Sequence, residues 1–282
     1  MTAPVPSSDV AAALDRDGAA IARGVLPPAW IERMRAAIDG EMAGASPTAA
    51  EYGKQAGRFY GDFFMWLHNA DFRAIALDSP LPELAAAVMG AKTVHLLYDQ
   101  LFVKEPGSVE RTPWHQDLPY WPVTGEQIVS IWVPVDAAGP DNGVVTYVRG
   151  SHLWGRTYRP QAFDERNAGA FAASPYEAMP MIDAARHELI SWRLEPGDVL
   201  LHKGLTIHGA AGNASTDRRR RALALRYTGD DVRYSARAGT FMEMASVRAF
   251  VPSPELADGD RLGGPLFPRA WAVDAGDVEA GD

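Results

Sequence analysis

Short apolar runs alternate with polar positions from Thr93 onward, a period of two that is typical of half-buried β-strands. Turn-forming stretches such as Asp141-Asn142-Gly143 and Glu195-Pro196-Gly197-Asp198 separate these runs. The pattern predicts strands over residues 93–104, 127–136, 143–148, 188–194, 198–202, 205–210 and 220–228. A series of short strands divided by turns indicates an all-β sandwich or barrel.

Before residue 93 the pattern is mostly helical. Apolar residues at spacings of three and four, from Trp30 to Ile38, predict an amphipathic helix that begins at Pro27-Pro28. We assign the aromatic segment 58–66 mainly to core packing. Two further helices, over residues 7–14 and 82–89, and a strand over 19–25 complete this part of the chain.

Three segments lack a clear period. Residues 44–57 are predicted to form a loop at the rim of a site, and residues 155–187 are too long for an ordinary connection, which makes them a candidate lid. Residues 236–282 are rich in proline and glycine and are predicted to form an irregular tail over the barrel.

The chain has 282 residues, of which 47% are hydrophobic, so it can bury a large core. We expect one domain over residues 1–282. It would consist of a helical part (1–92), a β core (93–235) and the tail (236–282).

The net charge and the absence of cysteine limit which macromolecules and which metal-ligand types the protein can use. The net charge of −9 argues against nucleic acid and anionic membranes, because affinity for phosphates comes mainly from clustered Lys and Arg. No stretch approaches the roughly 18 apolar residues of a membrane-spanning helix, and no basic and then apolar leader is present. We expect a cytoplasmic monomer or homodimer that binds a small molecule. Without cysteine, any metal must be held by His, Asp or Glu.

The motif His115-Gln116-Asp117 is the first candidate for such a site. In an extended strand these outer two side chains point to the same face, with Gln116 turned away. Together with His208 they would form the 2-His-1-carboxylate set of non-haem iron oxygenases. A lone His-x-Asp also occurs in surface turns and helix caps, so its context matters.

A run of arginines, residues 218–221, follows His208 and precedes an apolar strand. A metal-bound 2-oxoglutarate needs a cation for its distal carboxylate, and arginine binds a carboxylate through two parallel hydrogen bonds. Since side chains alternate in a strand, Arg219 and Arg220 cannot both face the metal.

Several more short motifs occur in a specific order. They are Asp17-Gly18-Ala19, Phe102-Val103-Lys104-Glu105-Pro106-Gly107, Trp114-His115-Gln116-Asp117, Trp132-Val133-Pro134-Val135-Asp136, Asn142-Gly143 before Gly150-Ser151-His152, Pro196-Gly197-Asp198, and His208 with its arginines. Over residues 10–235 this arrangement resembles the phytanoyl-CoA dioxygenase family of Fe(II)- and 2-oxoglutarate-dependent oxygenases. The resemblance implies a mainly β fold with flanking helices around a double-stranded β-helix (jelly-roll, cupin-like) core.

The same resemblance implies an oxidoreductase that uses Fe(II), 2-oxoglutarate and O2. It would hydroxylate an aliphatic carbon of a small-molecule metabolite and release succinate and CO2. His115, Asp117 and His208 would be the metal ligands and catalytic residues. Because a related halogenase needs the carboxylate position vacated, Asp117 makes halogenation unfavourable. The resemblance does not imply a particular substrate.

Further residues are candidates for the co-substrate and substrate sites. The resemblance places Trp132 beside 2-oxoglutarate, and alignment on the small residue Ala222 selects Arg220, with Arg219 as the rival. It also places Ala210 where the family often has a serine that touches the co-substrate, so that hydroxyl is missing here. Gln100 lies on a polar strand face and is a second co-substrate candidate. The substrate candidates are Tyr60, Tyr120 and Trp121; His202 is mainly structural and could lie behind the metal ligands.

Two other functions remain open. The protein could be a non-catalytic small-molecule binding protein that kept the fold, although the complete ligand set and arginine argue against this. It could also be a β-barrel hydrolase or isomerase that uses His115 and His208 with another divalent metal. Dependence on 2-oxoglutarate separates these possibilities.

Overall fold

The computed structural model describes residues 7–44, 46–52, 57–161, 169 and 171–273. The helices are α1 (Ser7–Asp17), α2 (Pro28–Ala43), α3 (Ala70–Asp78), α4 (Leu81–Met89) and α5 (Ala245–Phe250). The longer strands are β3 (Phe59–Phe63), β4 (Thr93–Lys104), β7 (Ile128–Pro134), β10 (Val199–Lys203) and β12 (Arg220–Thr228). The shorter strands are β1 (Ala19–Ala22), β2 (Ala50–Glu51), β5 (Thr112–His115), β6 (Val123–Thr124), β8 (Val145–Val148), β9 (Leu189–Ile190), β11 (His208–Ala210), β13 (Arg233–Tyr234) and β14 (Arg269–Ala272).

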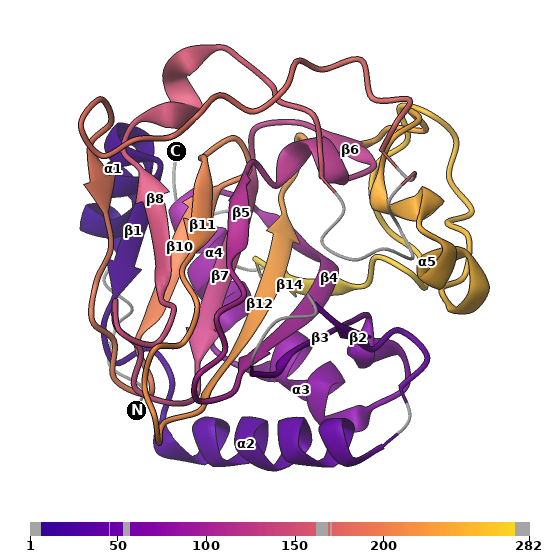
Figure 1. Cartoon of the computed structure of the whole chain (residues 1–282). Coiled ribbons are helices and arrows are strands. Elements are labelled where there is room, and N and C mark those ends of the chain that lie inside the picture. Colours follow the sequence, from indigo (N-terminus) through magenta and orange to yellow (C-terminus); the bar gives the residue numbers. More distant parts are fainter. Residues whose placement is uncertain (1–6, 45, 53–56, 162–168, 170, 274–282) are drawn as a thin grey trace.

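Two antiparallel sheets form the core of the fold (Figure 1). The larger sheet has the order β1-β10-β7-β12-β4-β3-β2, and β14 pairs with β4 off this path. The smaller sheet has the order β5-β11-β8-β9. Strands β2, β3 and β4 are neighbours both in the sheet and in sequence, as are β8 and β9. Most other neighbours are distant in sequence, so strands from the N-terminal, central and C-terminal parts of the chain lie side by side.

The two faces of the larger sheet differ in composition because side chains alternate along each strand. The outer face carries large apolar residues that pack with the helices in one core cluster, including Leu101, Ile131, Leu201, Leu223 and Leu225. The inner face carries smaller and more polar groups. Alanines 222 and 224 lie there with Trp132 and Leu200 and pack against Tyr147 of the smaller sheet. The inner face therefore leaves room for a site.

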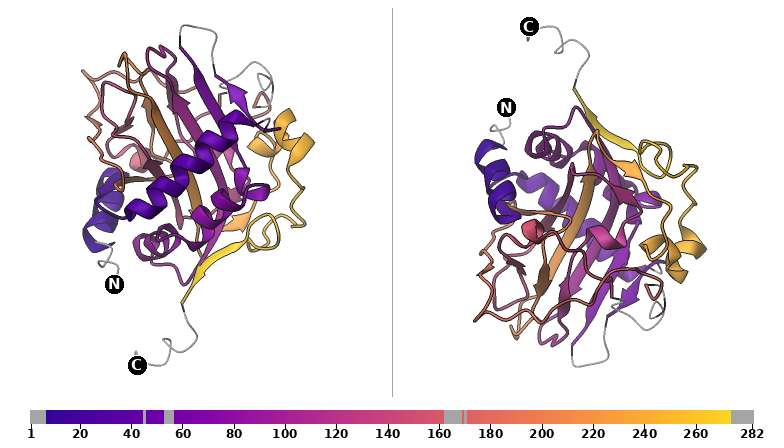
Figure 2. Two further views of the ribbon diagram at one scale, coloured as in Figure 1. Left: turned by 90° about the horizontal axis from the view of Figure 1, so that it is seen from below. Right: turned by 90° about the horizontal axis from the view of Figure 1, so that it is seen from above.

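Helix α2 lies across the outer side of the larger sheet, as the view from below shows (Figure 2). Its buried residues, Ile31, Met34, Ala37, Ile38 and Glu41, recur at spacings of three and four. This spacing confirms the predicted amphipathic, core-facing helix. No helix among the described residues is long and apolar enough to cross a membrane.

The strand predictions agree closely with the structure at β4 and β12, whose bounds match 93–104 and 220–228. Two others are much shorter than predicted. Of residues 188–194 only Leu189–Ile190 form a strand, and β11 begins at His208 rather than at 205 because a turn precedes it. The turn is closed by Thr206, whose amide donates to the Lys203 carbonyl.

Three parts of the chain are more regular than predicted. The aromatic segment contains strand β3, which pairs with β4. Helix α3 was not predicted, although Asn69 caps it by accepting hydrogen bonds from the amides of Asp71 and Phe72. The tail contains α5 and also β14, which extends the larger sheet.

Parts of the irregular predictions lie outside the described residues: 45 and 53–56 of the predicted rim loop, 162–168 and 170 of the candidate lid, and 274–282 of the tail. The described part of the rim loop includes β2, which pairs with β3.

Candidate active site

His115 and His208 come from neighbouring strands of the smaller sheet. His115 ends β5, His208 begins β11, and the two are direct partners in the antiparallel register. Asp117 follows two residues after β5. Among the described residues, these three are the group whose ligand atoms could hold a metal, with all three atoms within 4.8 Å of one another.

The backbone at Asp117 differs from the expected extended strand. Its φ of −79° and ψ of −44° are helical, and it precedes the 3-10 turn Leu118–Tyr120. The carboxylate nevertheless converges on the two imidazoles. Gln116 points away, as predicted, because its Nε2 donates to the carbonyls of Arg156 (3.0 Å) and Leu205 (2.9 Å). The turn, rather than strand alternation, therefore directs Asp117 toward the metal position.

Hydrogen bonds to the backbone define which imidazole nitrogen of His115 and of His208 can bind a metal. Nδ1 of His115 lies 2.8 Å from the Pro113 carbonyl, and Nδ1 of His208 lies 3.0 Å from the Thr206 carbonyl. A carbonyl can only accept, so each Nδ1 carries the hydrogen and each Nε2 keeps its lone pair. Burial lowers the pKa of His208 well below its usual value, which favours the neutral, ligating form.

The carboxylate of Asp117 uses its two oxygens differently. Oδ1 lies 3.5 Å from Nε2 of His115 and 3.8 Å from Nε2 of His208. Oδ2 faces the larger sheet instead. Burial alone would raise the pKa of Asp117, but the charge of Arg226 and the hydrogen bond from His202 hold it well below its usual value. Two neutral nitrogens and an ionised oxygen on one side of an open pocket fit a divalent metal such as Fe(II).

Arg219 and Arg220 point in opposite directions. Arg219 is on the surface and forms ion pairs with Glu105 (2.8 Å) and Asp39 (3.5 Å). Arg220 is only 2% exposed and lines the same pocket as the metal ligands. Its guanidinium lies over the Trp132 ring, 5.6 Å from the centroid, and donates one hydrogen bond to the Phe102 carbonyl. Burial lowers the pKa of Arg220 to about 10, so it remains charged at neutral pH.

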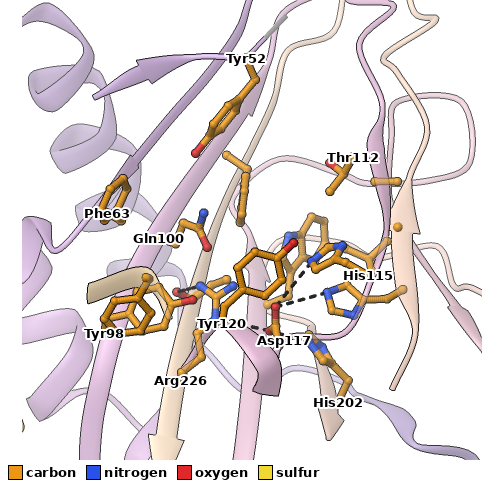
Figure 3. Close-up of a pocket in the computed structure, with 18 of the residues that line it drawn as sticks. Tyr52, Phe63, Tyr98, Gln100, Thr112, His115, Asp117, Tyr120, His202 and Arg226 are labelled. Carbon is orange, nitrogen blue, oxygen red and sulfur yellow. Dashed lines mark hydrogen bonds and ion pairs between the residues drawn. The ribbon is translucent and has the colours of Figure 1, made fainter. Parts of the chain in front are cut away.

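The pocket that holds the metal ligands also contains Gln100, Thr112 and Arg226 (Figure 3). Arg220 and Trp132 line it as well. Much of its remaining wall is aromatic and comes from several parts of the chain: Tyr52, Phe63, Phe64, Tyr98, Tyr120, Phe171 and Phe241. Among the described lining residues, the acidic and basic side chains other than histidine are Asp117, Arg220 and Arg226.

Comparison with known proteins identifies this arrangement. The sequence model of phytanoyl-CoA dioxygenase (PhyH) matches residues 14–222. The chain belongs to the phytanoyl-CoA dioxygenase family. The predicted membership of this iron- and 2-oxoglutarate-dependent oxygenase family is thus confirmed.

Relatives within and around the phytanoyl-CoA dioxygenase family cover most of the chain. The multifunctional dioxygenase prhA of Penicillium brasilianum is 27% identical over 234 residues, which are 79% of this chain and 72% of the fungal protein. The epimerase SnoN, solved with Fe3+, alpha ketoglutarate and nogalamycin RO, has a TM-score of 0.72 and 22% identity, covering 93% of this chain and 98% of SnoN. The carbocyclase SnoK has a TM-score of 0.71 and 22% identity, covering 94% of this chain and 96% of SnoK. The structural likenesses confirm the predicted jelly-roll fold.

The structure of this phytanoyl-CoA dioxygenase family member brings several predicted residues into the pocket. Gln100, Tyr120 and Trp132 line it together with Arg220. Ala210, which lacks the hydroxyl common in the family, also lines it, and its cross-strand partner Thr112 presents a hydroxyl side chain to the same pocket.

Two predicted substrate residues lie elsewhere. Tyr60 is on the outer side of β3, where its hydroxyl donates to Asp62 (3.1 Å), while Phe63 of the same strand lines the pocket. Trp121 is fully buried in the outer core, and its indole nitrogen donates to the hydroxyl of Tyr98 (3.0 Å). Neither side chain is among the described residues that line the pocket.

Sequence reasoning missed several pocket residues of this family member. Arg226 lies six positions after Arg220, so strand alternation alone would have placed it on the same face. Phe241 and Met244 come from the tail and gave no local signal. His202 was expected near the ligands, and its Nε2 does donate to Oδ2 of Asp117 (3.2 Å).

Proposed function

We propose that this protein is an Fe(II)- and 2-oxoglutarate-dependent dioxygenase that hydroxylates an aliphatic carbon of a small, largely uncharged metabolite and releases succinate and CO2. The proposal rests on one observation above others. Arg220, a buried cation, lies in the pocket of the three metal ligands without a carboxylate partner among the described residues.

A buried charge is costly unless it is paired. Arg220 donates to one carbonyl, and its Nε has no hydrogen-bond partner within the part of the chain that the structure describes. A dicarboxylate that binds the metal at one end could place its other carboxylate against this guanidinium. The Trp132 ring, over which the guanidinium lies, would stabilise its positive charge through a cation–π interaction. The neighbouring Arg219 cannot serve, since Glu105 and Asp39 already pair with it at the surface.

The metal ligands have separate tasks in this proposal. His115 and His208 would each bind through Nε2, and Asp117 through Oδ1. When bound there, Fe(II) with 2-oxoglutarate and O2 supplies the oxidising power: the co-substrate loses CO2 and becomes succinate while one oxygen atom enters the substrate. Thr112, the cross-strand partner of Ala210, offers the pocket a hydroxyl that Ala210 lacks.

The aromatic wall favours an uncharged substrate. Phe63, Phe64 and Phe241 present apolar surfaces to the pocket. Tyr98 stacks with Phe64 at 5.5 Å and meets Phe241 at 4.9 Å, so these rings form one continuous surface. Such a wall excludes water and binds apolar rings or chains by burial. Gln100 adds an uncharged polar group on the inner face of β4.

The proposed outcome of the reaction is hydroxylation, but the same iron and co-substrate could also serve epimerisation or ring formation. Solved structures of similar fold include an epimerase and a carbocyclase. The mass of the product separates these outcomes, because hydroxylation adds one oxygen atom, ring formation removes two hydrogens and epimerisation leaves the mass unchanged.

The first experiment adds Fe(II) and then 2-oxoglutarate to the metal-free protein without oxygen and follows the visible charge-transfer band of a chelated keto acid. Arg220→Met should weaken 2-oxoglutarate binding by about 10- to 100-fold, since charged hydrogen bonds contribute about 1.5–3 kcal/mol. Arg219→Met is the matched control and should leave the band unchanged.

Three other results contradict parts of the proposal. Folded protein that forms no band is not a 2-oxoglutarate enzyme, which favours a hydrolase or isomerase with another metal. A band without succinate release in air and with candidate substrates favours a binding protein that does not turn over. A band weakened only by Arg219→Met reverses the arginine assignment.

A further inference from the structure

The second oxygen of Asp117 has its own set of contacts. Ser130 Oγ donates to Oδ2 at 2.9 Å, His202 Nε2 donates to it at 3.2 Å, and Arg226 Nε lies 3.7 Å away as an ion pair. All three side chains are buried, with at most 4% exposure. His202 and Arg226 lie beside Asp117 in the pocket (Figure 3). Their contacts and that of Ser130 are with Oδ2, whereas Oδ1 faces Nε2 of His115 and His208.

These three residues form one row across the larger sheet. Ser130 on β7 is the register partner of both His202 on β10 and Arg226 on β12. The next partner in the row is Tyr98 on β4. The row therefore belongs to the rigid layer opposite the one that carries His115 and His208. Asp117 therefore contacts both sheets: Oδ1 faces the histidines of the smaller sheet, and Oδ2 contacts the row on the larger sheet.

Arg226 is held in place from both sides. Its guanidinium lies over the Tyr98 ring, 4.7 Å from the centroid, and its Nη1 donates to the Ala224 carbonyl at 3.2 Å. Tyr98 is in turn held by the indole of Trp121. A buried arginine with this support has little freedom to leave Asp117.

We propose that Arg226, with Ser130 and His202, positions Asp117 by occupying Oδ2, which leaves Oδ1 as the oxygen that would hold the metal. Arg226 is a positioning residue, which acts on the metal site through Asp117. A carboxylate that binds through one oxygen leaves one more coordination position open than a carboxylate that chelates through two. This role concerns residues outside the three metal ligands, and it rests on the proposed metal site but not on the proposed co-substrate or substrate.

The reason for three partners is geometric. Asp117 lies in a turn, whereas both histidines are tied to the β5–β11 ladder. The turn by itself does not hold the carboxylate plane. Contacts outside the ligand shell usually orient metal-binding carboxylates, and their loss typically weakens metal affinity by about 10- to 100-fold.

The test measures Co(II) binding to the metal-free protein in the absence of 2-oxoglutarate, by titration of the visible ligand-field absorption. Arg226→Met should weaken Co(II) binding by about 10- to 100-fold and change the absorption, because Oδ2 loses its ion pair and is held by Ser130 and His202 alone. Arg226→Lys keeps the charge and should restore part of the affinity. Neither effect is expected from general loss of stability, which thermal unfolding monitors separately.

Arg221→Met is the matched control. Arg221 is the neighbouring strand position of Arg220, faces away from the pocket and pairs with Asp136 at 2.8 Å. This variant should lose stability but keep the Co(II) affinity and spectrum of the native protein. Ser130→Ala removes a single hydroxyl and gives a second measurement if Arg226→Met does not fold; it should weaken Co(II) binding less than loss of the arginine.

The outcomes separate this proposal from the proposed function. Native protein that binds no Co(II) contradicts the metal site itself. Native protein that binds Co(II), with folded Arg226→Met or Ser130→Ala showing the same affinity and spectrum, overturns the positioning role alone.

Discussion

His115 and His208 face each other directly across the β5–β11 ladder, with ring centroids 4.2 Å apart. Their Nδ1 atoms are committed to the Pro113 and Thr206 carbonyls, so both Nε2 atoms are presented to the same point. The register of two short strands therefore builds most of the metal site.

Loss of either histidine should abolish tight metal binding. We expect His208→Ala to reduce Co(II) or Fe(II) affinity at least about 100-fold, because a missing ligand costs more than a missing supporting contact. His187→Ala is the control: this histidine bonds Asp183 in the 155–187 segment. Equal metal affinity in both variants contradicts the assigned site.

Trp132 should contribute to 2-oxoglutarate affinity through Arg220. Trp132→Leu removes the ring over which the guanidinium lies, and we expect binding to weaken about 3- to 30-fold, since a cation–π contact contributes about 0.5–2 kcal/mol depending on its desolvation. Trp132→Phe should lose less. The Arg33 guanidinium lies over Trp30 at 5.5 Å outside the pocket, so Trp30→Leu is the control and should leave 2-oxoglutarate affinity unchanged. Anaerobic titration of the charge-transfer band measures all three.

Lys104 should link 2-oxoglutarate binding to proton uptake. It is fully buried next to Arg220, and burial, followed by the charge of Arg220, lowers its pKa to about 6. An anion bound at Arg220 raises that pKa, so binding takes up protons and the affinity falls as pH rises above about 6. Calorimetry in buffers of different ionisation enthalpy should detect this uptake. Lys104→Met should remove it; uptake that persists in this variant assigns the proton to another group.

Asp99 should make stability depend on pH. It is fully buried on the outer face of β4, where Oδ2 accepts from the Trp66 amide, and desolvation raises its pKa to about 8. The folded state binds a proton that the unfolded state releases between about pH 4 and pH 8, so this group lowers the free energy of unfolding as pH rises through that range.

Asp99→Asn keeps the shape and cannot ionise. We expect it to raise the free energy of unfolding at pH 8.5 by at least about 2 kcal/mol, with a smaller effect at pH 5. Urea unfolding at the two pH values measures the difference. Asp217→Asn, at a side chain that is 83% exposed, should show no such change. A native protein whose stability is flat over this range, with no gain in Asp99→Asn, rules out the raised pKa.

Tyr60 was predicted to touch substrate, but the structure places it on the other side of β3 with Asp62. Tyr60→Phe should therefore leave turnover unchanged and lower the free energy of unfolding by about 1 kcal/mol, the usual effect of one hydrogen bond. Phe63→Ala, three positions along the same strand, should instead change substrate binding. Steady-state kinetics with chemical denaturation distinguishes the two.

The sequence alone determined the bounds of β4 and β12, two strands that line the site, and singled out His115, Asp117 and His208 as the candidate metal ligands. It did not predict β5, the short strand that carries His115. Alternation over residues 93–104 and 220–228 is a local property, because each side chain of a strand faces opposite to its neighbour whatever lies around it. The motif His115-Gln116-Asp117 with a distant His208 is equally readable, since few residue types bind iron.

Tertiary structure decided which face of each strand meets the pocket. A period of two separates Tyr60 from Phe63 and Arg219 from Arg220, but only the covering layer determines which of each pair is inside. It also brought Phe241 from the tail to the aromatic wall and set Arg226 behind Asp117. These are contacts between segments far apart in sequence, and their geometry arises from the packing of two sheets against each other rather than from any local pattern.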